Sequence, residues 1–220
     1  MIKRFLLSAF LAVCAFSAIA QVGMSSVATP TGAYNYTKIN SNVTTVVKGS
    51  YGTLRSININ TSGTASIATV YDSKVIPPVQ AAATTSSTGG TLAAATYYYV
   101  VTTVSAAGES FRSNEVSVAT AGTTSSNTIN WSAVSGATGY KIYRGTAAGV
   151  EDVFYSVGIV TTFLDTGAAN TAGTPPSGNP IAVINSASAP GTLLYDVAFS
   201  NGLVIVTTGT TAGDITISYK

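Results

Sequence analysis

Short runs of alternating apolar and polar residues follow one another along most of the chain after residue 20. The run at 54–60, Leu-Arg-Ser-Ile-Asn-Ile-Asn, has the two-residue period of a strand with one buried face. Clusters of Gly, Asn, Ser and Thr separate such runs at short spacing, as in β-sandwiches and barrels. The pattern predicts an all-β fold without helices after residue 20. The other predicted strands are 67–71, 97–104, 116–119, 129–131, 140–143, 195–199, 203–206 and 215–219.

Two proline-containing segments, Val-Ile-Pro-Pro at 75–78 and Thr-Pro-Pro-Ser-Gly-Asn-Pro at 174–180, divide the chain. Such segments are typical of domain boundaries. About a hundred residues lie between them, the size of one immunoglobulin-like sandwich. The two outer pieces are each too short to close a core. The sequence therefore predicts a discontinuous β-sandwich, from 21–76 plus 179–220, with a second β-sandwich at 77–178 inserted into it.

The middle segment carries four motifs that resemble the fibronectin type III family. These are Asn-Trp-Ser-Ala-Val at 130–134, Gly-Ala-Thr-Gly-Tyr-Lys-Ile-Tyr-Arg at 136–144, Thr-Phe-Leu-Asp-Thr-Gly at 162–167, and the tyrosine-rich run at 97–104 that leads into Gly108-Glu109-Ser110. In that family the Trp and Tyr side chains pack between two sheets, so the resemblance implies a fibronectin type III-like sandwich. In that family the Trp strand and the Tyr-Lys-Ile-Tyr strand precede the tyrosine-rich strand. Here the tyrosine-rich strand comes first, which implies a permuted strand order.

The two-residue period assigns faces within the tyrosine-rich run. Tyr97, Tyr99 and Val101 are expected to face the core, and Tyr98 the opposite side. Aromatic residues favour half-buried strand positions. Tyr98 is nevertheless the candidate for a surface contact, for example with a glycan.

The first twenty residues have the pattern of a secretory signal. Lys3 and Arg4 precede an apolar run at 5–16, and Ala18-Ile19-Ala20 offers a cleavage site before Gln21. The apolar run is short for a membrane-spanning helix. The sequence thus predicts a signal peptide-like leader at 1–20 and no stable membrane span after its removal. Two other hypotheses are a lipoprotein anchored at Cys14 and an uncleaved apolar tail buried in an assembly.

Composition favours a structural or binding role over catalysis. Charged residues make up 8% of the chain, against roughly 25% in ordinary domains. The chain has no histidine, and its one cysteine, Cys14, lies in the leader, so the commonest general base, nucleophilic thiol and transition-metal ligands are missing. We expect no enzymatic activity and no cofactor. A surface with so little charge repulsion favours self-assembly.

The charge balance argues against nucleic acid as a partner. Without Lys3 and Arg4 the chain has eight basic and eight acidic residues. The basic residues are scattered singly, whereas phosphate binding needs a basic stripe.

Asp165-Thr166-Gly167 matches the signature of aspartic proteases, in which two carboxylates share a proton. No second copy of the motif occurs, so a catalytic pair requires a dimer. The alternative is structural, with Asp165 capping a turn and Gly167 supplying an unusual backbone angle. We favour this alternative and keep a dimeric hydrolase as a third hypothesis for function.

A calcium site is a further alternative, because carboxylates are the ligands of calcium. Only Glu151 and Asp152 are adjacent acids, and no Asp-x-Asp-x-Asp loop occurs. We therefore expect no metal site, and we expect both residues to keep the tip of a hairpin solvated.

The whole arrangement resembles proteins of tailed phages and prophages that decorate heads, tails and fibres. The outer pieces contribute the runs at 52–61, 190–200 and 215–219 to this likeness. The resemblance implies a non-enzymatic structural or adhesion protein on the virion surface, with other virion proteins or further copies of itself as partners. The alternative is a secreted or surface-anchored bacterial binding module, directed at cell-surface glycans.

Overall fold

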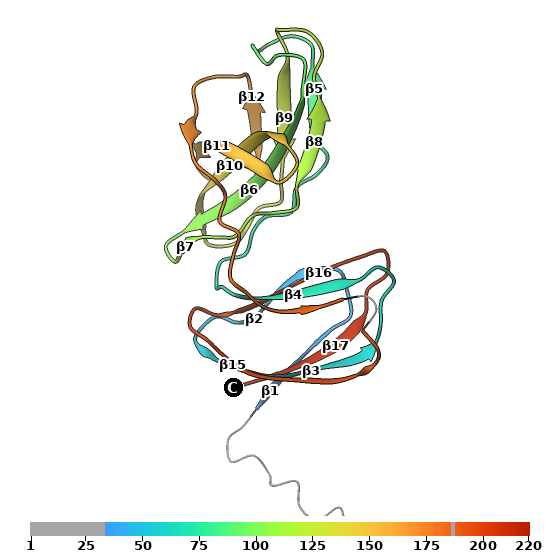
Figure 1. Cartoon of the computed structure of the whole chain (residues 1–220). Coiled ribbons are helices and arrows are strands. Elements are labelled where there is room, and N and C mark those ends of the chain that lie inside the picture. Colours follow the sequence, from blue (N-terminus) through green and yellow to red (C-terminus); the bar gives the residue numbers. More distant parts are fainter. Residues whose placement is uncertain (1–33, 186–187) are drawn as a thin grey trace, which may run out of the picture. The chain divides into compact units, whose positions relative to one another are not determined.

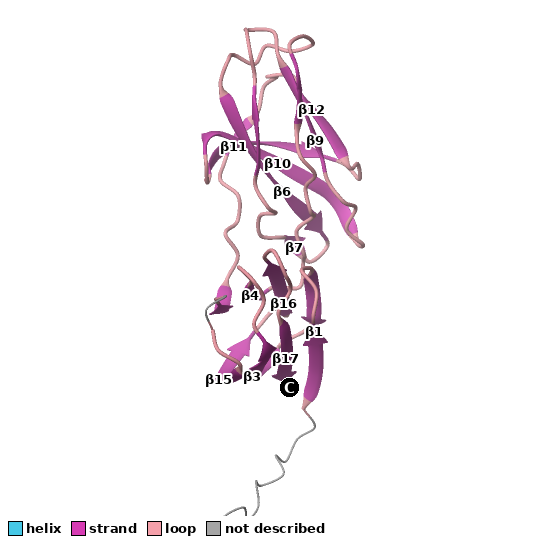
Figure 2. Cartoon of the chain, turned by 90° about the vertical axis from the view of Figure 1, so that its right-hand side faces the viewer, coloured by secondary structure: helices cyan, strands magenta, loops and turns pink. Residues whose placement is uncertain are grey.

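The protein is described by a computed structural model that covers residues 34–185 and 188–220. The predicted leader at 1–20, with Cys14, lies outside this part. The expectation of an all-β fold is confirmed, because the described residues form strands, turns and loops without a helix (Figures 1 and 2). In particular, nothing in this part is a helix of the length and apolar character needed to cross a bilayer.

Residues 35–72 and 180–219 together form two antiparallel sheets, which we call the flanking body. One sheet has the order β1 (Asn35–Ile39), β17 (Asp214–Tyr219), β3 (Gly52–Thr61) and β15 (Gly191–Phe199). The other has the order β14 (Pro180–Ile184), β4 (Ile67–Asp72), β16 (Leu203–Thr208) and β2 (Thr44–Lys48). Each sheet therefore combines strands from both outer pieces of the sequence.

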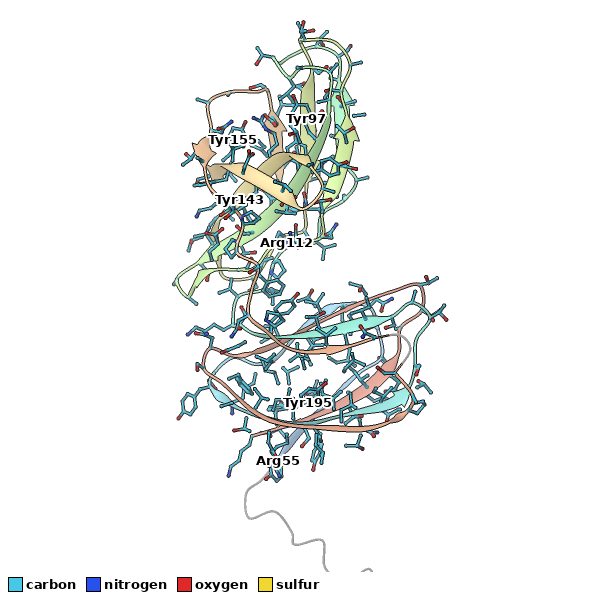
Figure 3. The ribbon with its side chains drawn as sticks, in the orientation of Figure 1. Arg55, Tyr97, Arg112, Tyr143, Tyr155 and Tyr195 are labelled. Carbon is cyan, nitrogen blue, oxygen red and sulfur yellow. The ribbon has the colours of Figure 1, made fainter. Side chains whose placement is uncertain are left out.

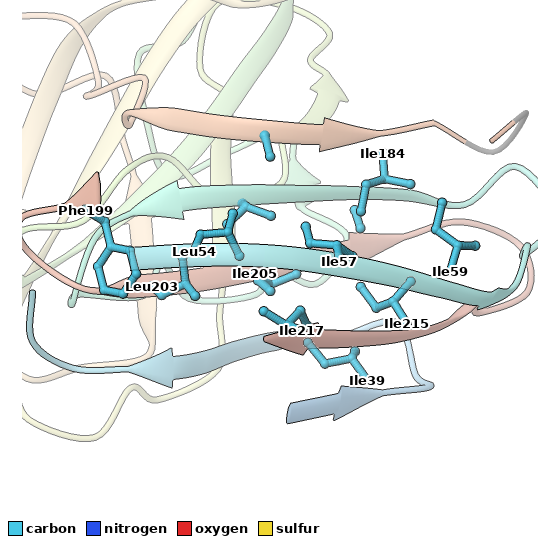
Figure 4. Close-up of a cluster of buried hydrophobic side chains, with 13 residues drawn as sticks. Ile39, Leu54, Ile57, Ile59, Ile184, Phe199, Leu203, Ile205, Ile215 and Ile217 are labelled. Carbon is cyan, nitrogen blue, oxygen red and sulfur yellow. The ribbon is translucent and has the colours of Figure 1, made fainter. Parts of the chain in front are cut away.

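The core of the flanking body lies between these sheets. Ile57 and Ile59 of β3 are buried there with Ile217 of β17 and Ile205 of β16 (Figure 4). Removing one such side chain from water contributes about 1.5–3 kcal/mol. The alternation seen in the sequence is the cause, because it directs these isoleucines inward and the polar residues between them outward.

Residues 84–172 form two further sheets, which we call the middle body. The larger sheet has the order β13 (Thr171–Ala172), β11 (Val150–Val157), β10 (Ala137–Ala147), β6 (Thr96–Ser105) and β7 (Gly108–Glu109), and β8 (Val116–Ala119) also pairs with β6. The smaller sheet has the order β12 (Thr162–Asp165), β9 (Ser126–Asn130) and β5 (Thr84–Ser86). Strands of the middle body pair among themselves.

An aromatic core fills the middle body. Tyr97, Tyr99 and Val101 are buried in it, as the two-residue period predicts. Trp131 packs against Tyr140, with ring centroids 5.4 Å apart at a tilt of 60°. The phenolic oxygen of Tyr140 accepts the backbone N–H of Val134 at 2.9 Å, so a buried polar group in this core is satisfied. Whether the two bodies are independent domains with the predicted boundaries stays a prediction.

Candidate functional site

The outward side of the sheet β1-β17-β3-β15 is the candidate contact surface. The alternation that buries Ile57 and Ile59 places Asn58 and Asn60 on the opposite side of β3. Register then aligns Thr192 of β15 with Asn58, and Thr216 of β17 likewise. We call this surface the Asn58 face. Its residues are Tyr36, Lys38, Asn58, Asn60, Thr192, Leu194, Asp214 and Thr216.

A chain of hydrogen bonds joins polar side chains of three strands of this face, β15, β3 and β17. The Thr192 hydroxyl donates to the side-chain oxygen Oδ1 of Asn58 at 2.9 Å, and Asn58 Nδ2 donates to Asn60 Oδ1. Asn60 donates in turn to Asp214 Oδ1 at 2.9 Å and to Thr216 Oγ1 at 3.0 Å. Neighbouring strands present their side chains close enough for such a ladder, which fixes the orientation of the side-chain amides on the face.

One charged pair ends this chain of hydrogen bonds. Lys38 Nζ of β1 lies 2.9 Å from Asp214 Oδ2. The hydrogen bonds from Asn60 and Lys38 hold the pKa of Asp214 below its usual range. The carboxylate is therefore ionised at neutral pH and presents acceptor oxygens at the surface.

Apolar side chains border the polar centre of the Asn58 face at both edges of the sheet. Tyr36 on β1 is 68% exposed, and Leu194 on β15 is 81% exposed. Exposed Tyr and Leu side chains supply apolar contact area to a partner, and the Tyr hydroxyl can also form a hydrogen bond. The face thus offers apolar contact area at its rim and directional hydrogen bonds at its centre.

The two edge strands differ in how open they are to a further strand. The pairing of β15 with β3 shifts register between Leu194 and Val197, and Asp196 there has φ of +50°. Such a bulge interrupts a regular edge. The five residues of β1 pair with β17 without a register shift. In the described part of the chain β1 has a neighbouring strand on one side alone. Its open edge is therefore more regular than the edge formed by β15.

Tyr98, the surface contact predicted from the sequence, lies on β6 of the middle body. It is half-exposed, and its partners in register are Gly145 and Ser117. The burial of Tyr97 and Tyr99 on the other side of β6 places it on the opposite face, as expected. Tyr98 is not among the residues of the Asn58 face. Its role in binding stays a prediction.

Asp165, the candidate protease residue, is fully buried and surrounded by donors. Its carboxylate accepts from the Tyr99 hydroxyl at 2.8 Å, from Arg144 Nη1 at 2.9 and 3.0 Å, and from the Tyr155 hydroxyl at 3.2 Å. The backbone N–H of Gly167 donates at 2.9 Å, and Gly167 has φ of +77°. This is the turn geometry expected from the structural interpretation.

Aromatic rings extend the Asp165 network. The Arg144 guanidinium lies 5.6 Å from the Tyr97 ring centroid and 5.5 Å from that of Tyr155. Figure 3 labels both tyrosines in the middle body. Burial first, and then the charge of Asp165, raise the pKa of the Tyr99 hydroxyl. Tyr99 therefore remains a donor at any ordinary pH. The described residues place no second carboxylate on Asp165, and both of its oxygens are already engaged by protein donors. These contacts are those of a structural network within the middle body. The dimeric hydrolase stays a hypothesis, because its second carboxylate would come from another copy of the chain.

A second acid of the middle body, Glu109, is engaged in the same way. Its carboxylate accepts from Thr102 and Tyr143 at 2.7 Å and from Lys141 at 2.6 Å. Burial acts to raise the pKa of Glu109, but the hydrogen bonds from Lys141, Tyr143 and Thr102 outweigh it and lower that pKa. Glu109 thus joins β6, β7 and β10 as an ionised structural group.

The prediction that Glu151 and Asp152 are both solvated at a hairpin tip is wrong for Glu151. Asp152 is exposed, but Glu151 is 2% exposed. The reason is a register shift on each side of Gly145 in the β10–β11 hairpin, which turns Glu151 inward. No group of three or more carboxylates that suits a metal ion occurs in residues 34–185 and 188–220.

These observations define an all-β protein with sandwich-like bodies and a polar, hydrogen-bonded face on one sheet. Comparison of the chain with protein-family models, curated proteins and solved structures gives no match. The geometry of its own residues therefore carries the functional proposal.

Proposed function

We propose that the protein is a non-enzymatic contact protein of a phage virion, such as a head decoration or fibre component. The observation that carries this proposal is the Asn58 face, with its ordered amide ladder between the exposed Tyr36 and Leu194. Other virion proteins, or further copies of the chain, are the proposed partners. Low overall charge supports close packing of such copies.

The regular edge of β1 gives the proposed contact a second component. A partner strand could add to this edge through backbone hydrogen bonds while its side chains meet Tyr36 and Lys38. Backbone pairing supplies affinity in such complexes, and side-chain contacts supply specificity. The proposed binding mode thus combines edge pairing with contact on the Asn58 face.

Photo-crosslinking within purified particles tests this proposal. A photoreactive amino acid at Tyr36 should give crosslinked products with one or a few virion proteins on a denaturing gel. The matched control is Tyr51, which is 77% exposed but lies in the turn before β3, outside the Asn58 face. We expect at least fivefold less product there. Absence of the chain from purified particles, or equal crosslinking at both positions, contradicts the proposal.

The second candidate is a secreted or surface-anchored module that binds glycans. One observation favours it: exposed Tyr36 shares a face with the Lys38–Asp214 pair. An aromatic ring can stack on a sugar while nearby polar groups bind its hydroxyls. Tyr98, half-exposed on the middle body, is the alternative contact residue for this function.

A glycan array probed with the chain lacking residues 1–20 tests the second candidate. Tyr36→Ala should reduce binding at least tenfold, since the stacking surface is lost, and Tyr51→Ala should leave binding unchanged. If Tyr98→Ala alone removes binding, the glycan site lies on β6 and the Asn58 face is not responsible. Failure to bind any glycan excludes this function for the sugars on the array.

A further inference from the structure

Glu151 of β11 is an acid whose burial no hydrogen bond compensates. It is 2% exposed, and neither of its carboxylate oxygens has a hydrogen-bond partner among the described residues. A buried ionised carboxylate without donors is strongly unfavourable, and such a group takes up a proton or acquires a partner. The other buried acid of the middle body, Asp165, is supplied with donors instead.

The shape of the β10–β11 hairpin holds Glu151 in this position. Glu151 pairs with Gly145, and the register shifts on both sides of that glycine. A Cβ atom on Gly145 would lie 1.9 Å from the carbonyl oxygen of Val150, so the bulge requires glycine. On the other side of Gly145, register places Tyr98 of β6. The bulge thus determines the side of the β10–β11 hairpin toward which the Glu151 side chain points.

Glu115, just before β8, is the group that meets Glu151. Its Oε2 accepts the backbone N–H of Gly149, in the hairpin turn, at 2.6 Å. Gly149 lies two residues before Glu151, so this bond places the Glu115 carboxyl beside the part of the hairpin that carries the unpartnered Glu151, and Glu115 is among the causes that raise the pKa of Glu151. Two ionised carboxylates are both acceptors, so a hydrogen bond between them requires a proton.

The remaining charged groups around the pair do not replace that proton. Arg112, in the same segment as Glu115, acts on Glu151 through its charge alone. Arg144 of β10 is bonded to Asp165. Tyr98 of β6 is the titratable group opposite Gly145.

We propose that Glu115 and Glu151 share one proton and form an acid-pair clasp. The clasp holds the turn of the β10–β11 hairpin against the segment that leads into β8, and it weakens when the proton is lost. Protonated Glu151 donates its O–H to the Glu115 carboxylate, which also keeps its bond from Gly149. Loss of the proton leaves two facing negative charges that repel each other across the same contact.

The clasp predicts a definite dependence of stability on pH. Burial first, and then the neighbouring Glu115 carboxyl, raise the pKa of Glu151 to about 7, whereas an unfolded Glu has a pKa of about 4.3. The folded state therefore holds a proton that the unfolded state releases in this interval. Stability from the clasp is complete below the unfolded value and is lost as pH rises through about 7.

The composition of the chain makes the pH dependence of stability that the clasp predicts easy to isolate. The sequence contains no histidine, so no ordinary side chain other than the raised carboxyl titrates between pH 5 and pH 8. The α-amino group does titrate near the upper end of this interval. A variant of Glu151 measured in parallel corrects for its contribution.

Thermal unfolding of the full chain between pH 5 and pH 8.5 tests the clasp. The unfolding midpoint of the unmodified protein should fall by about 5–10 °C over this range. Glu151→Gln keeps the shape, offers an N–H donor to Glu115 and should remove most of the fall. The control Asp152→Asn changes the exposed neighbouring acid and should retain the full fall. Equal slopes for all three proteins overturn the proposal.

A direct titration tests the clasp without any substitution. The carboxyl carbon of Glu151, followed by NMR in the unmodified chain, should titrate near pH 7, and the Gly149 amide should shift with the same midpoint. A Glu151 midpoint near the unfolded value overturns the proposal. A second result would also overturn it. If 1 mM calcium at pH 8 raises the unfolding midpoint of the unmodified protein but not that of Glu151→Gln, the two acids bind a cation and do not share a proton.

Discussion

Asp165 shows how a single buried acid organises the middle body. It connects β12 to Tyr99 of β6, Arg144 of β10 and Tyr155 of β11 through hydrogen bonds of 2.8–3.2 Å. Removing one partner from a buried charge network leaves the remaining groups uncompensated. We therefore expect a substitution of Asp165 to lower the free energy of unfolding.

Asp165→Asn should lower the free energy of unfolding by about 3 kcal/mol, because Arg144 keeps its buried charge without a counterion. Urea unfolding measures this loss. Asp196→Asn is the matched control, since Asp196 pairs with Arg55 at an exposed position and such pairs contribute about 0–1 kcal/mol. Equal losses for the two variants would show that the buried network adds nothing beyond an exposed pair.

The local sequence around Asp165 could predict the turn but not its partners. Leu-Asp-Thr-Gly indicates an aspartate cap and a glycine with positive φ, and both are present. Tyr99 and Arg144 lie in the larger sheet of the middle body and reach Asp165 in the smaller sheet over long sequence separations, which no local spacing encodes. Glu151 was mispredicted for a related reason, because a bulge at Gly145 changes which face a residue occupies.

Long strands with a clear alternation were predictable as elements. The run at 67–71 corresponds to β4, Ile67–Asp72, and the run at 97–104 to β6, Thr96–Ser105. The predicted strand at 129–131 is β9, Ser126–Asn130, and Trp131 follows it as an isolated bridge to Gln80. These strands pack directly on a core, so burial imposes the two-residue period on their sequences.

Several short or irregular strands were not predicted. Thr44–Lys48, β2, lies at a sheet edge with no fully buried residue, so its alternation is weak. Val150–Val157, β11, follows a bulged hairpin and carries a buried acid. The predicted strand at 195–199 covers only the second half of β15, Gly191–Phe199. Its first residue, Tyr195, packs against the core of the flanking body within a register shift (Figure 3). Sheet edges and bulges depend on how strands pair, and the alternation of apolar and polar residues in the sequence does not predict that pairing.

At the scale of the whole molecule, the ends of the segment between β4 and β14 lie side by side. The N–H of Asp72 donates to the carbonyl of Asn179 at 2.9 Å, and Tyr71 pairs with Pro180. The strand pairing of residues 35–72 and 180–219 is complete without any strand of the middle body. Periodicity predicted the fold class, but this pairing of distant segments depends on tertiary structure.

Excision of residues 77–176, with a short Gly-Ser linker in their place, should leave a folded flanking body. We expect a β-type circular dichroism spectrum and one cooperative unfolding transition. The reason is that the buried core of the flanking body consists of residues within 39–70 and 182–217, and none comes from the excised part. A linker of the same composition inserted within β3 is the control and should prevent folding. An unfolded product from the excision itself would show that the predicted discontinuous sandwich is not an independent domain.

The adjacency of Asp72 and Asn179 has a practical consequence. A graft whose own two termini are close together could replace the native segment without altering the register of either host sheet. Cargo of very different size, such as an antibody fragment or an epitope loop, could then be displayed from one fixed attachment point. Recombination between genes could exchange modules at the same point, since the host needs to conserve little beyond the spacing of two neighbouring strand ends.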